Sequence, residues 1–157
     1  MLNSLKQLKI KQTKIKGKTY WIKPIPQSTY KEGDIKAHIK YIKLLKINLK
    51  EYLPKIFLKR ENNTLLIYVE HIEGKWLSRD KFRRILNLPI NKAFKKGMKQ
   101  LLEKGYTLDF YGRGKNFIIN KRNKIYYVDT RMPLFSKKSN EGNRFEISKK
   151  KTLELFK

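Results

Sequence analysis

The chain has 157 residues, a length typical of one domain, and hydrophobic residues make up 39% of it, enough to form a core. It has no cysteine, which excludes disulfides and thiolate metal sites, and only two histidines, which argues against a His-rich zinc site. The formal net charge of +26 predicts a polyanionic partner, although an AT-rich genome would also produce such an excess of lysine.

Apolar runs are short throughout the sequence, as in TLLIYV at 64–69, so no transmembrane segment is expected. The first 18 residues are basic but lack a continuous apolar stretch, which argues against a secretory signal. A cytoplasmic location is the default expectation.

Strands are predicted first. Residues 5–25 alternate between apolar and cationic side chains, which predicts two strands joined by a turn at Gly17-Lys18. Pro24 and Pro26 end the second strand or place it at a sheet edge. Residues 55–72 predict a hairpin of two apolar strands that turns at Glu61-Asn62-Asn63.

A helix is predicted between these two pairs of strands, with Asp34 as its N-cap and its end before Pro54. Its apolar positions recur at helical spacing: Ile35, Ile39, Ile42, Leu45 and Leu49. His38 lies beside this apolar face and is expected to be a polar residue at its boundary.

The second half of the chain predicts mainly helices. Ser78 is expected to cap a short helix over 79–86, and a longer helix follows over 90–105 with Gly105 at its C-cap. Its predicted apolar face consists of Ile90, Ala93, Phe94, Met98, Leu101 and Leu102. Two short strands, NFII at 116–119 and KIYYVDT at 124–130, then form a hairpin, and TLELF at 152–156 predicts a terminal helix.

This order of elements is typical of an α+β protein, and it resembles the protein-kinase-like fold in a small, divergent form. TYWIKPI at 19–25 is similar to the strand that carries the phosphate-binding lysine. LLIYVEHIEGKWL at 65–77 is similar to the last small-lobe strand and the hinge. KGMKQLLEKGYTLDFYGRGKNFII at 96–119 resembles the helix that leads into the catalytic loop, and KIYYVDT resembles the strand before the metal-binding aspartate.

The resemblance implies a fold and its boundaries. A single kinase-like domain would span residues 1–135, with a small antiparallel-sheet N-lobe carrying one helix at 1–73 and a truncated, mainly helical C-lobe at 74–135. Residues 136–157 would form a basic C-terminal tail, helical at its end.

The resemblance also implies site residues for ATP and Mg²⁺. Lys23 would pair with the nucleotide phosphates, and the hinge backbone at Glu70, His71 and Ile72 would bind the adenine. Asn116 and Asp129 would supply oxygen ligands to Mg²⁺.

Asp109 would be the catalytic base or orienting carboxylate, since it is the only local candidate. It lies two positions farther from Asn116 than the family spacing requires, and Tyr111 occupies the expected position. Arg113 and Lys115 lie within this loop, where their charges would favour an anion.

These residues indicate a kinase-like protein that binds a nucleotide or another phosphate ligand. If it is an enzyme, it would transfer a phosphoryl group from ATP to a small or anionic acceptor. The first alternative is a non-catalytic basic protein, either a pseudokinase-like scaffold or a nucleic-acid-binding domain. That alternative is favoured by Tyr20, Trp21 and Tyr30 near a row of cations: Lys6, Lys9, Lys11, Lys14, Lys16 and Lys18. A second alternative is a protein that acts on anionic lipid at a membrane surface.

Each candidate residue also has a purely structural interpretation. Lys23 would then belong to a solvated strand face, and Glu70 and Glu73 would be surface acids at a strand end. Asp109 and Asp129 would form salt bridges with Arg113 or Arg131.

Overall fold

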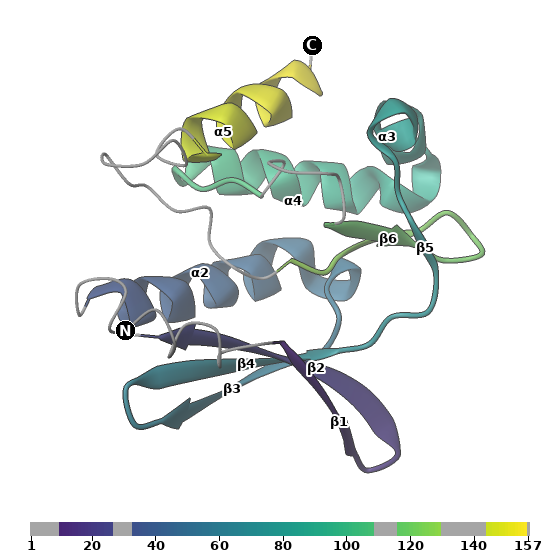
Figure 1. The fold of residues 1–157 in the computed structure, drawn as a ribbon. Coiled ribbons are helices and arrows are strands. Elements are labelled where there is room, and N and C mark those ends of the chain that lie inside the picture. The colour runs from purple at the N-terminus through teal and green to yellow at the C-terminus, as the bar shows by residue number, and fades with distance from the viewer. Residues whose placement is uncertain (1–9, 27–32, 109–115, 130–143, 157) are drawn as a thin grey trace. The chain divides into compact units, whose positions relative to one another are not determined.

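The computed structural model describes residues 10–26, 33–108, 116–129 and 144–156, which form an α+β protein with small antiparallel sheets and helices (Figure 1). Contacts along the chain group into two units. Unit 1 comprises residues 1–40 and 54–72, and unit 2 comprises residues 41–53 and 73–157. Among the described residues, no helix has both the length and the apolar character needed to cross a bilayer.

Unit 1 contains a four-stranded antiparallel sheet in the order β1-β2-β4-β3. Its strands are β1 (Lys11–Ile15), β2 (Lys18–Pro26), β3 (Ile56–Glu61) and β4 (Thr64–Glu70). The first turn is at Lys16-Gly17, one residue earlier than predicted, and both residues have positive φ, as a two-residue hairpin turn requires. Asn62 also has positive φ, and the second hairpin turns within the predicted residues.

The helix α2 (Gly33–Leu49) lies between the two hairpins in the sequence, and the short 3₁₀ helix η2 (Lys50–Tyr52) follows it. As predicted, both end before Pro54. Residues up to Lys40 belong to unit 1 and the rest of α2 belongs to unit 2. The expectation for His38 is wrong, because its side chain is buried with only 1% of its surface exposed. His38 falls one helical turn after Ile35 and one before Ile42, so it shares their buried face.

Unit 2 contains a three-stranded antiparallel sheet in the order β5-β6-β7. Its strands are β5 (Lys75–Trp76), β6 (Phe117–Ile119) and β7 (Ile125–Tyr127), of which the last two are predicted from the sequence. Gly74 allows the chain before β5 to approach β6 closely, because a Cβ at this position would lie 2.3 Å from the carbonyl oxygen of Ile119.

The helices of unit 2 are α3 (Arg79–Leu86), the 3₁₀ helix η3 (Pro89–Asn91), α4 (Lys92–Glu103) and α5 (Arg144–Glu154). The end of α4 is capped as predicted: Gly105 has φ +83°, its N–H donates to the carbonyl of Leu102, and the N–H of Tyr106 donates to the carbonyl of Leu101. These two hydrogen bonds form a Schellman motif, which satisfies carbonyls at the helix end.

The buried face of α4 differs from the predicted one at two positions. Ala93 is exposed, whereas Gly97 is buried beside Phe94, Met98 and Leu101. A Cβ at Gly97 would lie 2.2 Å from the carbonyl oxygen of Asn48, so glycine is needed where α4 packs against the C-terminal part of α2.

An aromatic cluster joins the sheet of unit 2 to its helices. The ring of Phe117 on β6 lies 4.8 Å from that of Phe82 on α3, 6.3 Å from that of Phe94 on α4 and 5.2 Å from that of Tyr127 on β7. The first two contacts are edge-to-face, a favourable arrangement for aromatic rings.

The helix α5 begins well before the predicted TLELF segment and is part of unit 2. Ser148 and Thr152 are almost completely buried. The hydroxyls of Thr152 and Thr107 are 3.1 Å apart, and the guanidinium of Arg83 donates to the carbonyl of Glu154 at 2.8 Å. Hydrogen bonds thus attach α5 to two other segments of unit 2.

Candidate functional site

Asn116 and Asp129 lie at the same end of the β6–β7 hairpin. Phe117 is paired with Tyr127 in the antiparallel register, and beyond this pair the N–H of Val128 donates to the carbonyl of Asn116 at 3.0 Å. Asp129 is the next residue along the chain. The hairpin therefore brings Asn116 and Asp129 to neighbouring backbone positions.

The two side chains differ in depth. Asp129 is buried, with 6% of its surface exposed, and Asn116 is half-buried. A carboxylate at this depth is stable only with hydrogen bonds or a cation, because burial removes most of its hydration.

The side-chain oxygens of Asn116 and Asp129 are of the kind that binds Mg²⁺. Amide and carboxylate oxygens are hard ligands, which Mg²⁺ prefers. The described residues contain no group of three or more Asp, Glu, His or Cys side chains that could hold a metal ion. Asn116 and Asp129 would therefore supply only a few of the oxygen ligands of a bound Mg²⁺. Phosphate oxygens and water would supply the others.

Asn116 also lines a cavity of about 260 Å³ in unit 2. Apolar side chains form part of its wall: Leu77, Phe82, Phe117 and Leu155. Arg79 and Arg83 from α3 and Lys151 from α5 contribute positive charge, and Glu154 contributes negative charge. The amide of Asn116 is therefore next to a cavity with apolar and cationic walls.

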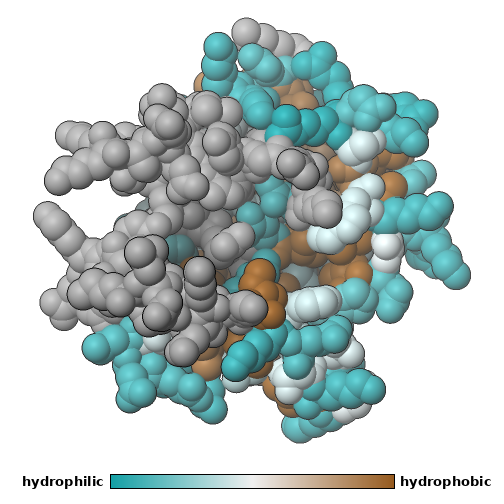
Figure 2. Space-filling view, viewed as in Figure 1, coloured by the Kyte–Doolittle hydropathy of each residue, from teal (hydrophilic) through white to brown (hydrophobic). Residues whose placement is uncertain are grey.

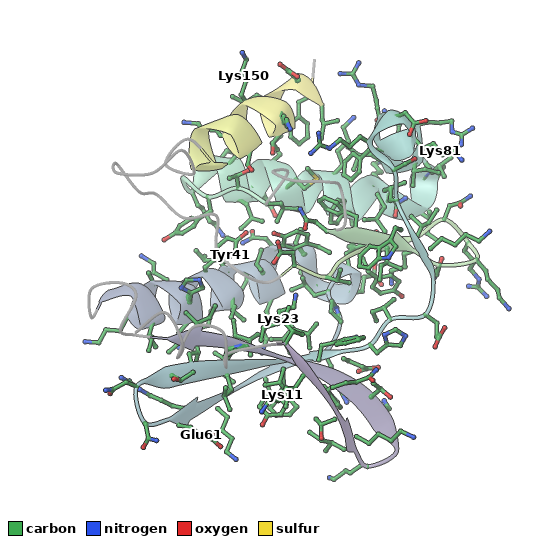
Figure 3. All side chains as sticks on the ribbon, viewed as in Figure 1. Lys11, Lys23, Tyr41, Glu61, Lys81 and Lys150 are labelled. Carbon is green, nitrogen blue, oxygen red and sulfur yellow. The ribbon has the colours of Figure 1, made fainter. Side chains whose placement is uncertain are left out.

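Lys23 lies on the apolar face of the sheet in unit 1 (Figure 3). It is paired directly with Ile67 on β4, and directly paired residues point to the same face of an antiparallel sheet. On that face Ile67 and Val69 are almost completely buried, and Lys23 itself is half-buried. Lys23 is therefore not on a fully solvated strand face, in contrast to the structural interpretation of its sequence.

The segment from Glu70 to Ile72 follows β4, and its backbone is partly engaged within unit 1. The N–H of Glu70 donates to the carbonyl of Lys55 at 2.9 Å, and the N–H of His71 donates to the carbonyl of Thr19 at 2.8 Å. The indole N–H of Trp21 donates to Nδ1 of His71 at 3.1 Å. Two of the three backbone amides expected to face an adenine therefore already have partners within unit 1.

Three candidate residues, Asp109, Arg113 and Lys115, lie outside the described residues. Their predicted roles as catalytic base and anion-binding cations stay predictions. Of the candidates that the structure does describe, Lys23, Glu70, His71 and Ile72 belong to unit 1, and Asn116 and Asp129 belong to unit 2.

Asn91 is a structural residue that the sequence analysis did not single out. It is fully buried, and its amide donates to the carbonyls of Ile85 and Asn123 at 2.8 Å each, while its Oδ1 accepts from the N–H of Ile125 at 2.9 Å. It thus attaches the end of α3 to the β6–β7 turn. The sequence signal was weak, because an asparagine after Pro89 is also an ordinary turn residue.

Charge and polarity dominate the described surface. Hydrophilic residues cover much of the part of this surface seen in Figure 2, with hydrophobic residues between them. Together with the net charge of +26, such a surface attracts anions electrostatically.

Comparison with known proteins does not assign a family. No protein-family model matches the sequence, and no curated protein is significantly similar to it. The functional proposal therefore depends on the residues and on the geometry within each unit.

Proposed function

We propose that the protein is kinase-like and binds a nucleotide, ATP, together with Mg²⁺, and that Asn116 and Asp129 are the protein ligands of the metal. The observation that carries this proposal is the register of the β6–β7 hairpin, which leaves Asn116 and the buried Asp129 at neighbouring backbone positions at one end of the hairpin. The small antiparallel sheet with a helix in the first half of the chain and the helices in the second half are compatible with this assignment.

Each proposed residue has a defined role in phosphate chemistry. Bound Mg²⁺ would neutralise charge on the phosphate oxygens. Lys23, which is half-buried on a sheet face of unit 1, would contact the nucleotide phosphates through its ammonium group. In an active enzyme, Asp109 would orient the hydroxyl of a small or anionic acceptor, which would receive the terminal phosphoryl group.

The small number of protein ligands leads to a specific expectation for metal binding. Two oxygen-bearing side chains do not form a complete Mg²⁺ site, because the ion prefers six oxygens in octahedral geometry. Mg²⁺ should therefore bind the free protein weakly and bind strongly only together with ATP. The same argument predicts that ATP binds more weakly when EDTA removes the metal.

A thermal-unfolding experiment tests this proposal with ATP plus Mg²⁺, ATP plus EDTA, and Mg²⁺ without nucleotide. ATP plus Mg²⁺ at about 100 times its Kd should stabilise the protein by about 2.7 kcal/mol. For a chain of this length, that corresponds to a rise in Tm of about 5–10 °C. Asp129→Asn removes the charge but preserves the shape of the side chain, and it should abolish most of the rise relative to its own ligand-free Tm.

Glu103→Gln is the matched control, since it removes one exposed carboxylate from the end of α4, away from the hairpin. This variant should keep the full ATP and Mg²⁺ response. The proposal fails if the native protein shows no response to ATP plus Mg²⁺, or if Asp129→Asn responds as strongly as Glu103→Gln. Binding without phosphoryl transfer to any small acceptor would identify a non-catalytic, pseudokinase-like protein.

A further inference from the structure

A basic groove lies beside the β6–β7 turn of unit 2, with a volume of about 950 Å³. Its walls include Lys75 on β5 and three cations of the turn, Lys121, Arg122 and Lys124. Glu73 is the one acid among the described residues that line it. We refer to this concavity as the basic groove, and it is distinct from the cavity that Asn116 lines.

Hydrogen bonds determine the shape of the turn over residues 120–124. The Oδ1 of Asn120 accepts from the backbone N–H of Arg122 at 2.9 Å and from that of Lys124 at 3.0 Å. Asn123 has φ +63°, and its carbonyl accepts from the amide of the buried Asn91. The turn therefore presents its cations from a backbone that is already ordered.

Lys124 contributes to the structure of the turn itself. Its ammonium group lies 5.2 Å from the centre of the Tyr52 ring and 5.0 Å from that of Tyr126, within the range of cation–π attraction. It also lies 3.8 Å from the carboxylate of Glu51. Lys75, Lys121 and Arg122 are exposed, and these three are the cations suited to contact a ligand.

We propose that the basic groove binds single-stranded nucleic acid, with backbone phosphates at Lys75, Lys121 and Arg122 and a base against Tyr126. The three cations come from two segments that line one groove, so a ligand with several phosphates can contact more than one of them. Tyr126, which is half-buried and has the Lys124 ammonium over its ring, lines the same groove and is the aromatic side chain there against which a base would stack.

The size and the order of the groove support a single strand in particular. A volume of about 950 Å³ has room for a few nucleotides of one strand. Because Asn91 and Asn120 already order the turn, binding immobilises few protein groups and loses little conformational entropy.

Fluorescence anisotropy with labelled single-stranded DNA and RNA of about 12 nucleotides, measured over a range of salt concentrations, tests this proposal. Lys121→Ala combined with Arg122→Ala removes two phosphate contacts. The slope of log K against log[salt] should become shallower by about 1.4, since each contact with a single strand contributes about 0.7. We expect affinity near physiological salt to fall by about tenfold.

Lys96→Ala combined with Lys99→Ala is the matched control, because it removes the same charge from exposed positions of α4 that do not line the groove. This double variant should preserve most of the affinity and the slope. Equal losses in the two double variants would overturn the proposal, since binding would then depend on net charge and not on the groove. Thermal unfolding of each variant confirms that it is folded.

Tyr126→Leu separates stacking from electrostatics. It should reduce affinity by about fivefold or more, because a base loses its aromatic contact, but leave the salt slope unchanged. Duplex DNA, inorganic polyphosphate and vesicles with anionic lipid serve as competitors, and displacement by any of them as efficient as by single strands would overturn the proposal. Asp129→Asn should bind single strands normally, so this proposal and the proposed function can fail independently.

Discussion

Gly97 is buried on α4 because the helix passes too close to the backbone of Asn48 for any side chain to fit. Glycine within a helix is usually unfavourable by about 1 kcal/mol relative to alanine. At this position steric exclusion is the larger effect, because a Cβ only 2.2 Å from a carbonyl oxygen would force one backbone segment to move.

Gly97→Ala should therefore destabilise the protein, although it raises helix propensity. We expect a net loss of about 2 kcal/mol in the free energy of unfolding, since forced overpacking typically costs about 1–3 kcal/mol. This loss should lower Tm by about 4–8 °C in a chain of this length. Urea denaturation followed by circular dichroism measures the change.

Lys99→Ala serves as the control for Gly97→Ala, because Lys99 is exposed on the same helix and the substitution barely changes helix propensity. Its free energy of unfolding should stay within about 0.5 kcal/mol of the native value. An unchanged or higher stability of Gly97→Ala would mean that α4 can move away from Asn48 without loss.

Side-chain burial was the part of the residue-level prediction most often wrong. Hydrophobic periodicity predicted Ala93 in the core and could not predict Gly97, because glycine has no apolar side chain that contributes to such a pattern. It also placed His38 at a boundary, although the position of His38 on the helix places it on the buried face. For Gly97 the deciding factor was Asn48, a neighbour distant in the sequence that a local pattern does not contain.

At the scale of elements, α3 begins where its sequence predicts, but its N-cap residue does not make the expected hydrogen bond. Ser78 occupies the predicted N-cap, but its side chain makes no capping hydrogen bond to the helix backbone. A hydrogen bond from the Ser78 hydroxyl instead lowers the pKa of the Asp80 carboxyl below its ordinary value, with a smaller contribution from the charge of Lys81.

Ser78→Ala should therefore destabilise the protein in a pH-dependent manner. The pKa of Asp80 is lowered in the folded state, so its interaction with Ser78 adds stability above the unfolded-state pKa and loses it as the pH falls through the folded-state pKa. The native protein should be more stable than Ser78→Ala at pH 7, and the difference should diminish in the acid range below about pH 4.

Chemical denaturation of both proteins at pH 7, 5 and 3 measures this difference, and Asp80→Asn provides the control. In the Asp80→Asn background, the effect of Ser78→Ala should no longer depend on pH in the acid range, because the titrating group is absent. A pH-independent difference in the native background would show that Ser78 acts on the helix without Asp80.

Most elements were predictable because their patterns are local. The two hairpins, the long helix between them, α3, α4 and the β6–β7 pair all have periodic apolar positions or turn residues in the sequence. β5 was missed because two residues have no periodicity, and its pairing depends on the close approach that Gly74 permits. The start of α5 was placed too late because few apolar residues precede TLELF.

At the scale of the whole molecule, the net charge of +26 implies strong self-repulsion in the folded state. Tm should therefore rise as NaCl increases from about 10 mM to about 150 mM, because the Debye length falls from about 30 Å to about 8 Å and the repulsion is screened. Thermal unfolding over this range measures the effect. A Tm that falls with salt would indicate that attractive ion pairs outweigh repulsion.

Some features of the whole molecule could be predicted from the sequence and others could not. The α+β class and the short hairpin with Asn116 and Asp129 at one end follow from the order and the periodicity of the elements. The basic groove was not predicted, because Lys75 and Arg122 are distant in the sequence and only the pairing of β5 with β6 joins their segments into one sheet. A local sequence pattern contains no information about such pairing.

The ordered turn at residues 120–124 also has a consequence for proteolysis. Lys121, Arg122 and Lys124 mark peptide bonds that trypsin would cleave in a flexible chain. A protease must draw its substrate into an extended conformation, and the hydrogen bonds of Asn120 and Asn91 oppose this. Despite its basic sequence, the folded turn should therefore resist trypsin, so that cleavage there reports local opening of the β6–β7 hairpin.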